Sequence, residues 1–265
     1  RASCFQVDFR GDPVGAKDSV NEWVSGQTQD KINDLIRSVR PDTLLVLVNA
    51  VYFKGKWNNP FNPEATKDDL FYPVPRSPGV KVPFMWKSSS FNYFQAKGAQ
   101  IVELFYGEER AFSLALILPK DAPGALKSLE KKLDQALWES WRQGLKPQRL
   151  VLGLPKFKIT WESPSLVGPL RELGMELPFG DAADFGGIAE AANLKITDVI
   201  QKAFIQVEEE GAEAAAATGS GGLIAMAGPP EPKPPLVLVN RPFLFLIKDN
   251  QTQSVLFMGR LNDPS

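Results

Sequence analysis

Short apolar runs and alternating apolar and polar positions dominate this chain, and both patterns predict β-strands. One run, residues 44–53, is nearly all apolar, which is typical of a strand buried on both faces. Asn49 interrupts this run, and a buried Asn must be hydrogen-bonded. The other predicted strands are residues 5–9, 91–95, 101–106, 112–118, 149–154, 156–161, 199–208, 236–239, 243–249 and 255–261.

Helical spacing of apolar residues predicts helices at residues 16–26, 32–39, 125–141 and 165–173. Pro41 ends the second of these helices, and Gly174 ends the last. Many strands combined with segregated helices indicate an α+β protein with antiparallel or mixed sheets.

An unusual tract, residues 208–218, joins the predicted strand 199–208 to a Gly/Pro-rich stretch, residues 219–235. In an extended chain, side chains alternate between two faces. The only charge beyond the opening glutamates is Glu213, and the face opposite to it is uniformly small: Ala212, Ala214, Ala216, Thr218 and Ser220. The tract can therefore form a strand with one buried face, although its composition also fits a helical turn or an inert linker.

Composition excludes several classes of function. The 30 Lys and Arg residues balance 31 Asp and Glu residues, which argues against nucleic acid or an anionic membrane as the main partner. There is no histidine, which excludes Ser-His-Asp and Cys-His catalysis and any His-ligated metal site. Cys4 is the only cysteine, so no internal disulfide can form. We interpret Glu208, Glu209 and Glu210 as a solvated charge run, because adjacent residues on a strand point to opposite faces.

Six motifs resemble, in order, segments of the serpin family of serine protease inhibitors. They are residues 48–57 (VNAVYFKGKW), 154–158 (LPKFK), 173–175 (LGM), 183–188 (ADFGGI), 240–245 (NRPFLF) and 255–260 (VLFMGR). Residues 209–218 resemble the hinge of the family's reactive-centre loop. The resemblance implies the serpin fold: α+β, with a large mixed sheet, smaller antiparallel sheets, packed helices and an exposed reactive-centre loop at about residues 211–235.

The resemblance implies a suicide-substrate inhibitor, which is not an enzyme and needs no cofactor or metal. The target serine protease acylates itself on a bond of the loop, and the cleaved hinge inserts between the strands at 44–53 and 199–208. The implied partner is that protease, in a covalent acyl complex with a monomeric inhibitor, and neither nucleic acid nor a membrane. Only the resemblance favours an extracellular location. The implied hinge residues are Glu209, Glu210, Gly211, Ala212, Glu213, Ala214, Ala215, Ala216, Ala217 and Thr218.

Two counts place the cleaved bond at neighbouring positions. Counting forward from Gly211 at the family spacing places it between Ala225 and Met226, which we favour. Counting back from the exit at Pro229 places it between Met226 and Ala227. Either bond presents a small or unbranched apolar residue, so we expect an elastase-like, subtilisin-like or chymotrypsin-like target. A trypsin-like pocket would leave its buried acid unpaired.

Asn49, Trp57 and Gln201 match positions at which the family keeps residues that control opening of the sheet, and plain core packing is the alternative for them. Gln201 replaces a histidine found in many members, and Ala212 replaces a frequent Thr. The family also has a largely helical N-terminal block ahead of the segment matched here. We therefore expect residues 1–265 to form a single serpin domain that is N-terminally incomplete. A non-inhibitory carrier, chaperone or storage serpin is the alternative function, although such members usually carry bulky or charged hinge residues.

Overall fold

The structure is a computed structural model, and it describes residues 3–40, 42–75, 77–188, 194–210 and 233–265. The chain divides into two compact units. The first contains Arg1–Phe53 and Lys158–Ile205, and the second contains Lys54–Phe157 and Gln206–Ser265. Each unit has a hydrophobic cluster of its own.

The first unit contains a three-stranded sheet with the order β1-β8-β7. These strands are β1 (Leu45–Phe53), β8 (Ile196–Val207) and β7 (Phe157–Glu162). β1 and β8 run parallel, and Asn49 lies opposite Gln201 in their register. The short helices of this unit are α4 (Val167–Glu172) and the 3-10 helix η2 (Leu177–Phe179).

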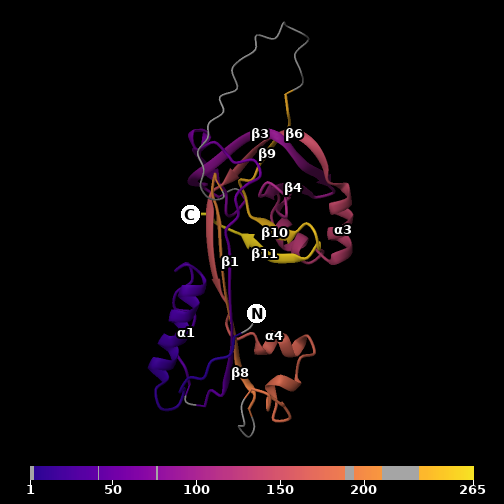
Figure 1. Cartoon of the computed structure of the whole chain (residues 1–265). Coiled ribbons are helices and arrows are strands. Elements are labelled where there is room, and N and C mark those ends of the chain that lie inside the picture. The colour runs from indigo at the N-terminus through magenta and orange to yellow at the C-terminus, as the bar shows by residue number, and fades with distance from the viewer. Residues whose placement is uncertain (1–2, 41, 76, 189–193, 211–232) are drawn as a thin grey trace. The chain divides into compact units, whose positions relative to one another are not determined.

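Helix α1 (Pro13–Gln27) packs against this sheet (Figure 1). The helix begins where its sequence predicts, because the Asp12 side chain accepts a hydrogen bond from the Gly15 N–H at 2.9 Å and Pro13 occupies the first turn. Its buried Val24 forms a cluster with Phe204 of β8 and with Ile32 from the following loop. The hydrophobic face of α1 therefore holds it to β8.

The second unit is built on an eight-stranded sheet with the order β11-β10-β5-β4-β3-β6-β9, and β2 also pairs with β3. All of these pairs are antiparallel except β6 with β9, so the sheet is mixed. The strands are β2 (Lys67–Phe71), β3 (Val80–Ala96), β4 (Ala99–Tyr106), β5 (Phe112–Pro119), β6 (Lys146–Pro155), β9 (Leu236–Leu238), β10 (Phe243–Asp249) and β11 (Val255–Leu261).

Three helical segments belong to this unit: the 3-10 helix η1 (Pro63–Ala65), α2 (Ala125–Glu130) and α3 (Gln135–Gly144). Helix α3 is amphipathic, and its buried Trp138 and Trp141 pack on Ile101, Ile117 and Leu244 of the sheet. Burying two indole rings provides much of the apolar area that fixes α3 to the sheet.

A buried ion pair crosses the same sheet. Glu103 of β4 and Lys248 of β10 are 4% and 6% exposed at their side chains, and their charged atoms lie 2.9 Å apart. Ser113 Oγ donates to Glu103 Oε1 at 2.9 Å, and Asn92 Nδ2 donates to Glu103 Oε2 at 2.8 Å. The carboxylate is therefore hydrogen-bonded from β3, β5 and β10 at once, which stabilises its charge in a buried position.

The α+β class with a mixed sheet is confirmed, and most of the predicted strands are present. β2 was not predicted, and the predicted strand at 5–9 is wrong because those residues are irregular. The predicted helix 125–141 divides into α2 and α3, since Asp134 starts a new helix by accepting from the Leu137 N–H at 2.8 Å.

The predicted helix at 32–39 is also wrong. Asp34 has a φ of +53°, which a helix cannot contain. The Asn21 side chain hydrogen-bonds both the N–H and the C=O of Ile36, at 2.8 and 2.9 Å, and so replaces helical partners for that residue. The helical spacing of Ile32 and Leu35 is real, but it reflects burial of a loop beneath α1.

Two further expectations about β1 are wrong. None of its residues is buried, although a strand buried on both faces was predicted. β1 is an edge strand among the described residues, which leaves one side of it open. Asn49 is accordingly exposed rather than buried.

Candidate functional site

The candidate site surrounds Glu208–Glu210, the residues that follow β8 and that we call the loop root. Three consecutive backbone carbonyls of the loop root accept hydrogen bonds from one segment of the second unit. Trp57 donates its indole N–H to the Glu208 carbonyl at 2.7 Å and its backbone N–H to the Glu210 carbonyl at 3.3 Å. The backbone N–H of Phe61 donates to the Glu209 carbonyl at 2.9 Å. The donors lie in residues 57–66, which we call the anchor segment.

The aromatic residues of the anchor segment, Trp57 and Phe61, are buried and pack against each other. Trp57 and Phe61 are 4% and 2% exposed, and their rings meet edge to face at 6.1 Å. Trp57 also stacks on Tyr106 at 4.2 Å with an interplanar angle of 14°. Burial raises the pKa of Tyr106, so this phenol stays neutral. The two rings fix the indole in the orientation that its hydrogen bond to the loop root requires.

The carboxylate of Glu209 is held as firmly as its backbone. Thr66 Oγ1 donates to Oε1 at 2.7 Å, and Lys156 Nζ lies 2.9 Å from Oε2. Burial alone would raise the pKa of Glu209, but the hydrogen bonds from Lys156 and Thr66 outweigh it and lower the pKa. The side chain is only 12% exposed. The interpretation of Glu208, Glu209 and Glu210 as a solvated charge run is therefore wrong for Glu209.

Asn49 and Gln201 lie opposite each other in the first unit, and their predicted role in sheet opening stays a prediction. Gln201 Nε2 donates to Asn49 Oδ1 at 3.4 Å, which is a long hydrogen bond between exposed side chains. The backbone of Gln201 is held more tightly by Ser163, whose hydroxyl accepts from the Gln201 N–H at 2.8 Å. The Ser163 N–H in turn donates to the Gln201 carbonyl at 2.8 Å. Sequence reasoning did not identify Ser163.

The remaining predicted site residues lie outside the described part of the chain. They are Gly211 to Thr218 of the hinge and Ala225, Met226 and Ala227 of the cleaved bond. Glu209 and Glu210, the first hinge residues, belong to the loop root. Thr66, Lys156 and Phe61, which hold Glu209, were not predicted. The available signal was Lys156, which stands inside one of the family-like motifs.

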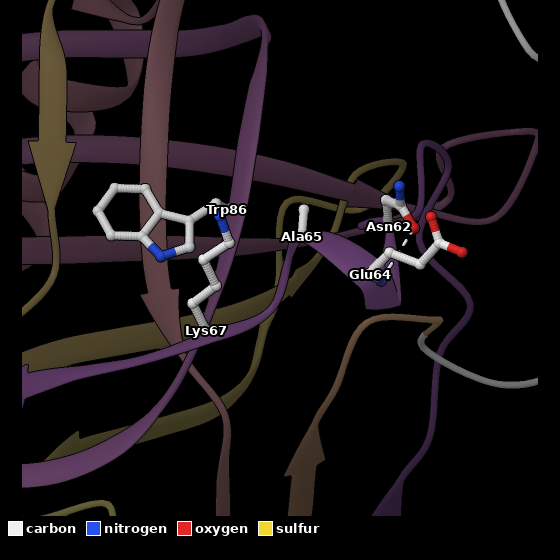
Figure 2. Close-up of a pocket in the computed structure, with 5 residues that line it drawn as sticks. All are labelled: Asn62, Glu64, Ala65, Lys67 and Trp86. Carbon is white, nitrogen blue, oxygen red and sulfur yellow. Dashed lines mark hydrogen bonds between the residues drawn. The ribbon is translucent and has the colours of Figure 1, made fainter.

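A cavity of about 480 Å³ borders the anchor segment (Figure 2). It is lined by Asn62, Glu64, Ala65, Lys67 and Trp86. Asn62 Oδ1 accepts from the Glu64 N–H at 3.0 Å, which caps η1 and fixes this wall of the cavity (Figure 2). Across the part of the chain that the structure describes, no group of three or more His, Cys, Asp or Glu could hold a metal ion, and no helix is long and apolar enough to cross a membrane. The site offers backbone donors and one ion pair, and such groups hold a segment in place.

Comparisons with known proteins agree on one family. The family model described as Serpin (serine protease inhibitor) matches residues 1–264. An uncharacterized serpin-like protein of Thermococcus kodakarensis is 37% identical over 260 residues, which are 98% of this chain and 59% of that protein. Leukocyte elastase inhibitor of Sus scrofa is 38% identical over 274 residues, which are 99% of this chain and 70% of that protein. The solved structure of human thyroxine-binding globulin with thyroxine is similar with a TM-score of 0.85 and 28% identity, over 98% of this chain and 67% of that one. The chain thus spans less than two thirds of the Thermococcus protein.

Proposed function

This chain belongs to the serpin family, and we propose that it inhibits a serine protease as a suicide substrate. The observation that carries the proposal is the position of the loop root. It follows β8, the central strand of a three-stranded sheet, and it leads directly into the small-faced tract at 211–218. The hydrogen bonds to the loop root would keep the loop out of the sheet before cleavage. The tract that follows could then form a strand once the loop is cleaved.

The direction of the chain favours insertion next to β8. β1 and β8 are parallel and pair from Leu45 to Phe53 along β1. Because the tract follows β8, a tract that turns back would run antiparallel to β8 and therefore to β1. One parallel ladder would be replaced by two antiparallel ladders, which are slightly more stable per residue. Roughly ten additional backbone hydrogen bonds at about 0.5–1.5 kcal/mol each give a driving force on the order of 10 kcal/mol.

The side chains of the tract suit a buried position. Its even-numbered face carries Ala212, Ala214, Ala216 and Thr218, and none of them is large enough to resist entry between two strands. Alanine has low β propensity, so the ladder bonds rather than local preference would stabilise the new strand. Such insertion is the established device of inhibitory serpins.

The chemical step belongs to the protease. Its serine hydroxyl attacks the carbonyl of Ala225, the Ala225–Met226 bond breaks, and the amine of Met226 leaves with a proton. The Ala225 acyl group then stays on the protease as an ester. Insertion of the hinge before water hydrolyses this ester traps the complex. The alternative bond, Met226–Ala227, would place Met226 on the protease. Both bonds suit an elastase-like, subtilisin-like or chymotrypsin-like target.

The test is incubation of this chain with pancreatic elastase, subtilisin, chymotrypsin and trypsin, followed by a denaturing gel and mass spectrometry. We expect a covalent band with at least one of the first three proteases, at the mass of the protease plus residues 1–225, and a released peptide that begins at Met226. A released peptide that begins at Ala227 would select the alternative bond. Trapping of trypsin alone would contradict the proposed specificity, and cleavage by all four proteases without a covalent band would contradict inhibition.

A non-inhibitory role is the second candidate, since the chain is also similar to thyroxine-binding globulin. Such a protein would be cleaved in its loop as an ordinary substrate. The gel that tests trapping therefore decides between the two candidates. The small side chains at Ala212, Ala214 and Ala216 favour the inhibitor.

A further inference from the structure

Lys87 of β3 holds three consecutive residues of the anchor segment. Its ammonium donates to the carbonyl of Asn59 at 2.5 Å and also to the carbonyl of Pro60. The same ammonium lies 5.6 Å from the centre of the Phe61 ring, within the range of a cation–π interaction. One side chain thus binds residues 59, 60 and 61 from the β3 side.

The opposite side of this tripeptide faces the loop root. The N–H of Phe61 donates to the Glu209 carbonyl, and the Phe61 ring packs against Trp57. The hydrogen bond between Phe61 and Glu209 can form only while residues 59–61 keep their present path. Asn59 makes a second link to β3, since its Nδ2 donates to Ser89 Oγ at 3.2 Å. Lys87 and Ser89 are two positions apart on the strand and therefore point to the same face.

The acceptors of Lys87 are two neutral carbonyls and an aromatic ring, which sets it apart from the other lysine that projects from the same strand. Lys81 pairs with the carboxylate of Asp68 at 3.3 Å, and both of those side chains are more than half exposed. Lys87 is partly buried, and burial lowers its pKa to about 8. A lysine placed in this way orients backbone, because its donors are directed at fixed carbonyls rather than at a mobile carboxylate.

We infer that Lys87 is a positioning residue for the loop root: it holds residues 59–61 in the path that keeps Phe61 bound to Glu209. The consequence for inhibition rests on the proposed function. Insertion of the hinge must begin by freeing Glu209 and Glu210, so the Lys87 contacts raise the barrier to leaving the resting state. Loss of Lys87 would release the root more readily.

The experiment is amide hydrogen exchange on this chain, read by NMR at the Phe61 N–H and the Trp57 indole N–H. Lys87→Met keeps the aliphatic stem and removes the donors, and Lys87→Arg keeps a cation. Lys81→Met is the matched control on the same strand. We expect exchange at Phe61 to become faster by roughly tenfold in Lys87→Met, which is the scale of one net hydrogen bond. In Lys87→Arg, the increase in the exchange rate at Phe61 should be less than half of the increase in Lys87→Met. In Lys81→Met, the exchange rate at Phe61 should equal that of wild type.

Exchange at Leu116, in the buried centre of β5, reports on the fold as a whole. Unchanged exchange at Phe61 in Lys87→Met overturns the inference. Equal acceleration at Phe61 and Leu116 also overturns it, because it assigns Lys87 a general structural role. If Lys87→Met does not fold, Lys87→Gln takes its place: faster exchange at Phe61 than at Leu116 supports the inference, and unchanged or equally faster exchange at the two sites overturns it. Because no protease is present, this result is independent of trapping, so the proposed function can fail while the positioning role stands.

Discussion

The carboxylate of Glu209 lies 2.9 Å from the ammonium of Lys156, and this pair holds the loop root, which precedes the tract that we expect to insert. Lys156 also donates its backbone N–H to the Pro83 carbonyl of β3 at 2.9 Å. The lysine is therefore fixed to the sheet of the second unit before it binds Glu209. A charge pair with a fixed partner loses less side-chain entropy than a pair of mobile surface residues.

Lys156→Met should lower the free energy of unfolding by about 1–2 kcal/mol, because Glu209 keeps Thr66 but loses the cation that neutralises it. Urea unfolding monitored by tryptophan fluorescence measures this change. Lys81→Met is the control, since its pair with Asp68 is exposed and should be worth less than about 0.5 kcal/mol. An equal loss in the two variants would mean that Lys156 acts only as a surface charge.

The free energy of unfolding should fall in acid because Glu209 becomes protonated. The pKa of Glu209 is lowered from an ordinary value of 4.5, so the folded carboxylate binds fewer protons than the unfolded one. Its contribution is complete above pH 4.5 and is lost as the pH falls through the lower folded value. Urea titrations at several pH values between about 2 and 6 should show a steeper decline in wild type than in Glu209→Gln. Parallel profiles for the two proteins would contradict this role of Glu209.

The sequence allowed the prediction of Trp57 but not of the residues that hold Glu209. Thr66 stands 143 positions before Glu209, and no local pattern pairs residues at such a distance. The prediction that Glu209 is solvated was wrong because strand alternation gives only the direction in which a side chain points. It does not show which distant residues, here Thr66 and Lys156, lie in that direction. The prediction of a helix at residues 32–39 was wrong for a related reason. Its buried positions follow helical spacing, but a single side chain, Asn21, satisfies the backbone of Ile36 in place of a helix.

Predictions of strands in the second unit were more reliable, and the closing strands show why. Residues 243–249 and 255–261 were predicted with the bounds that β10 and β11 have. A connection of a few residues brings these strands together as a hairpin, so local sequence and tertiary contact agree. β2 was missed because its residues are mostly charged or exposed and form a strand only against the long β3.

Lys87 should make stability rise with pH in the alkaline range. Its folded pKa is about 8 against an ordinary value of 10.5, so between these values the unfolded chain binds more protons than the folded chain. The free energy of unfolding should therefore increase from pH 8 to 10.5, by about 1 kcal/mol once solvent screening of a partly exposed amine is allowed for. The difference between wild type and Lys87→Met isolates this residue from other lysines and tyrosines. A difference that does not change with pH would contradict the expectation.

Replacing only one residue of the buried Glu103–Lys248 pair should lower the free energy of unfolding strongly. Lys248→Met leaves a buried carboxylate without its cation, and we expect a loss of about 3–5 kcal/mol. Lys248→Met combined with Glu103→Leu removes both charges and should recover at least half of that loss. Urea unfolding of both single variants and of the double variant gives the coupling between the two residues. Additive losses would show that the charges are not coupled.

The last prediction concerns the two faces of the hinge, and it depends on the proposed function. Ala214 and Ala216 lie on the small face, and Ala215 lies on the other face with Glu213. If the small face enters the sheet, Ala216→Arg places a cation where no solvent can reach it, so insertion slows and water hydrolyses the acyl ester first. Cleavage continues while the covalent complex disappears.

Ala215→Arg is the matched control, because the same cation on the opposite face stays near Glu213. We expect the ratio of cleaved inhibitor to trapped protease to rise at least about tenfold for Ala216→Arg, since burying an unpaired charge costs more than 1.4 kcal/mol, and to change far less for Ala215→Arg. Densitometry of the denaturing gel measures this ratio for each variant with the protease that wild type traps. Equal ratios in the two variants would mean that the alternation of small side chains does not govern insertion. A higher ratio for Ala215→Arg would show that the other face is the one that becomes buried.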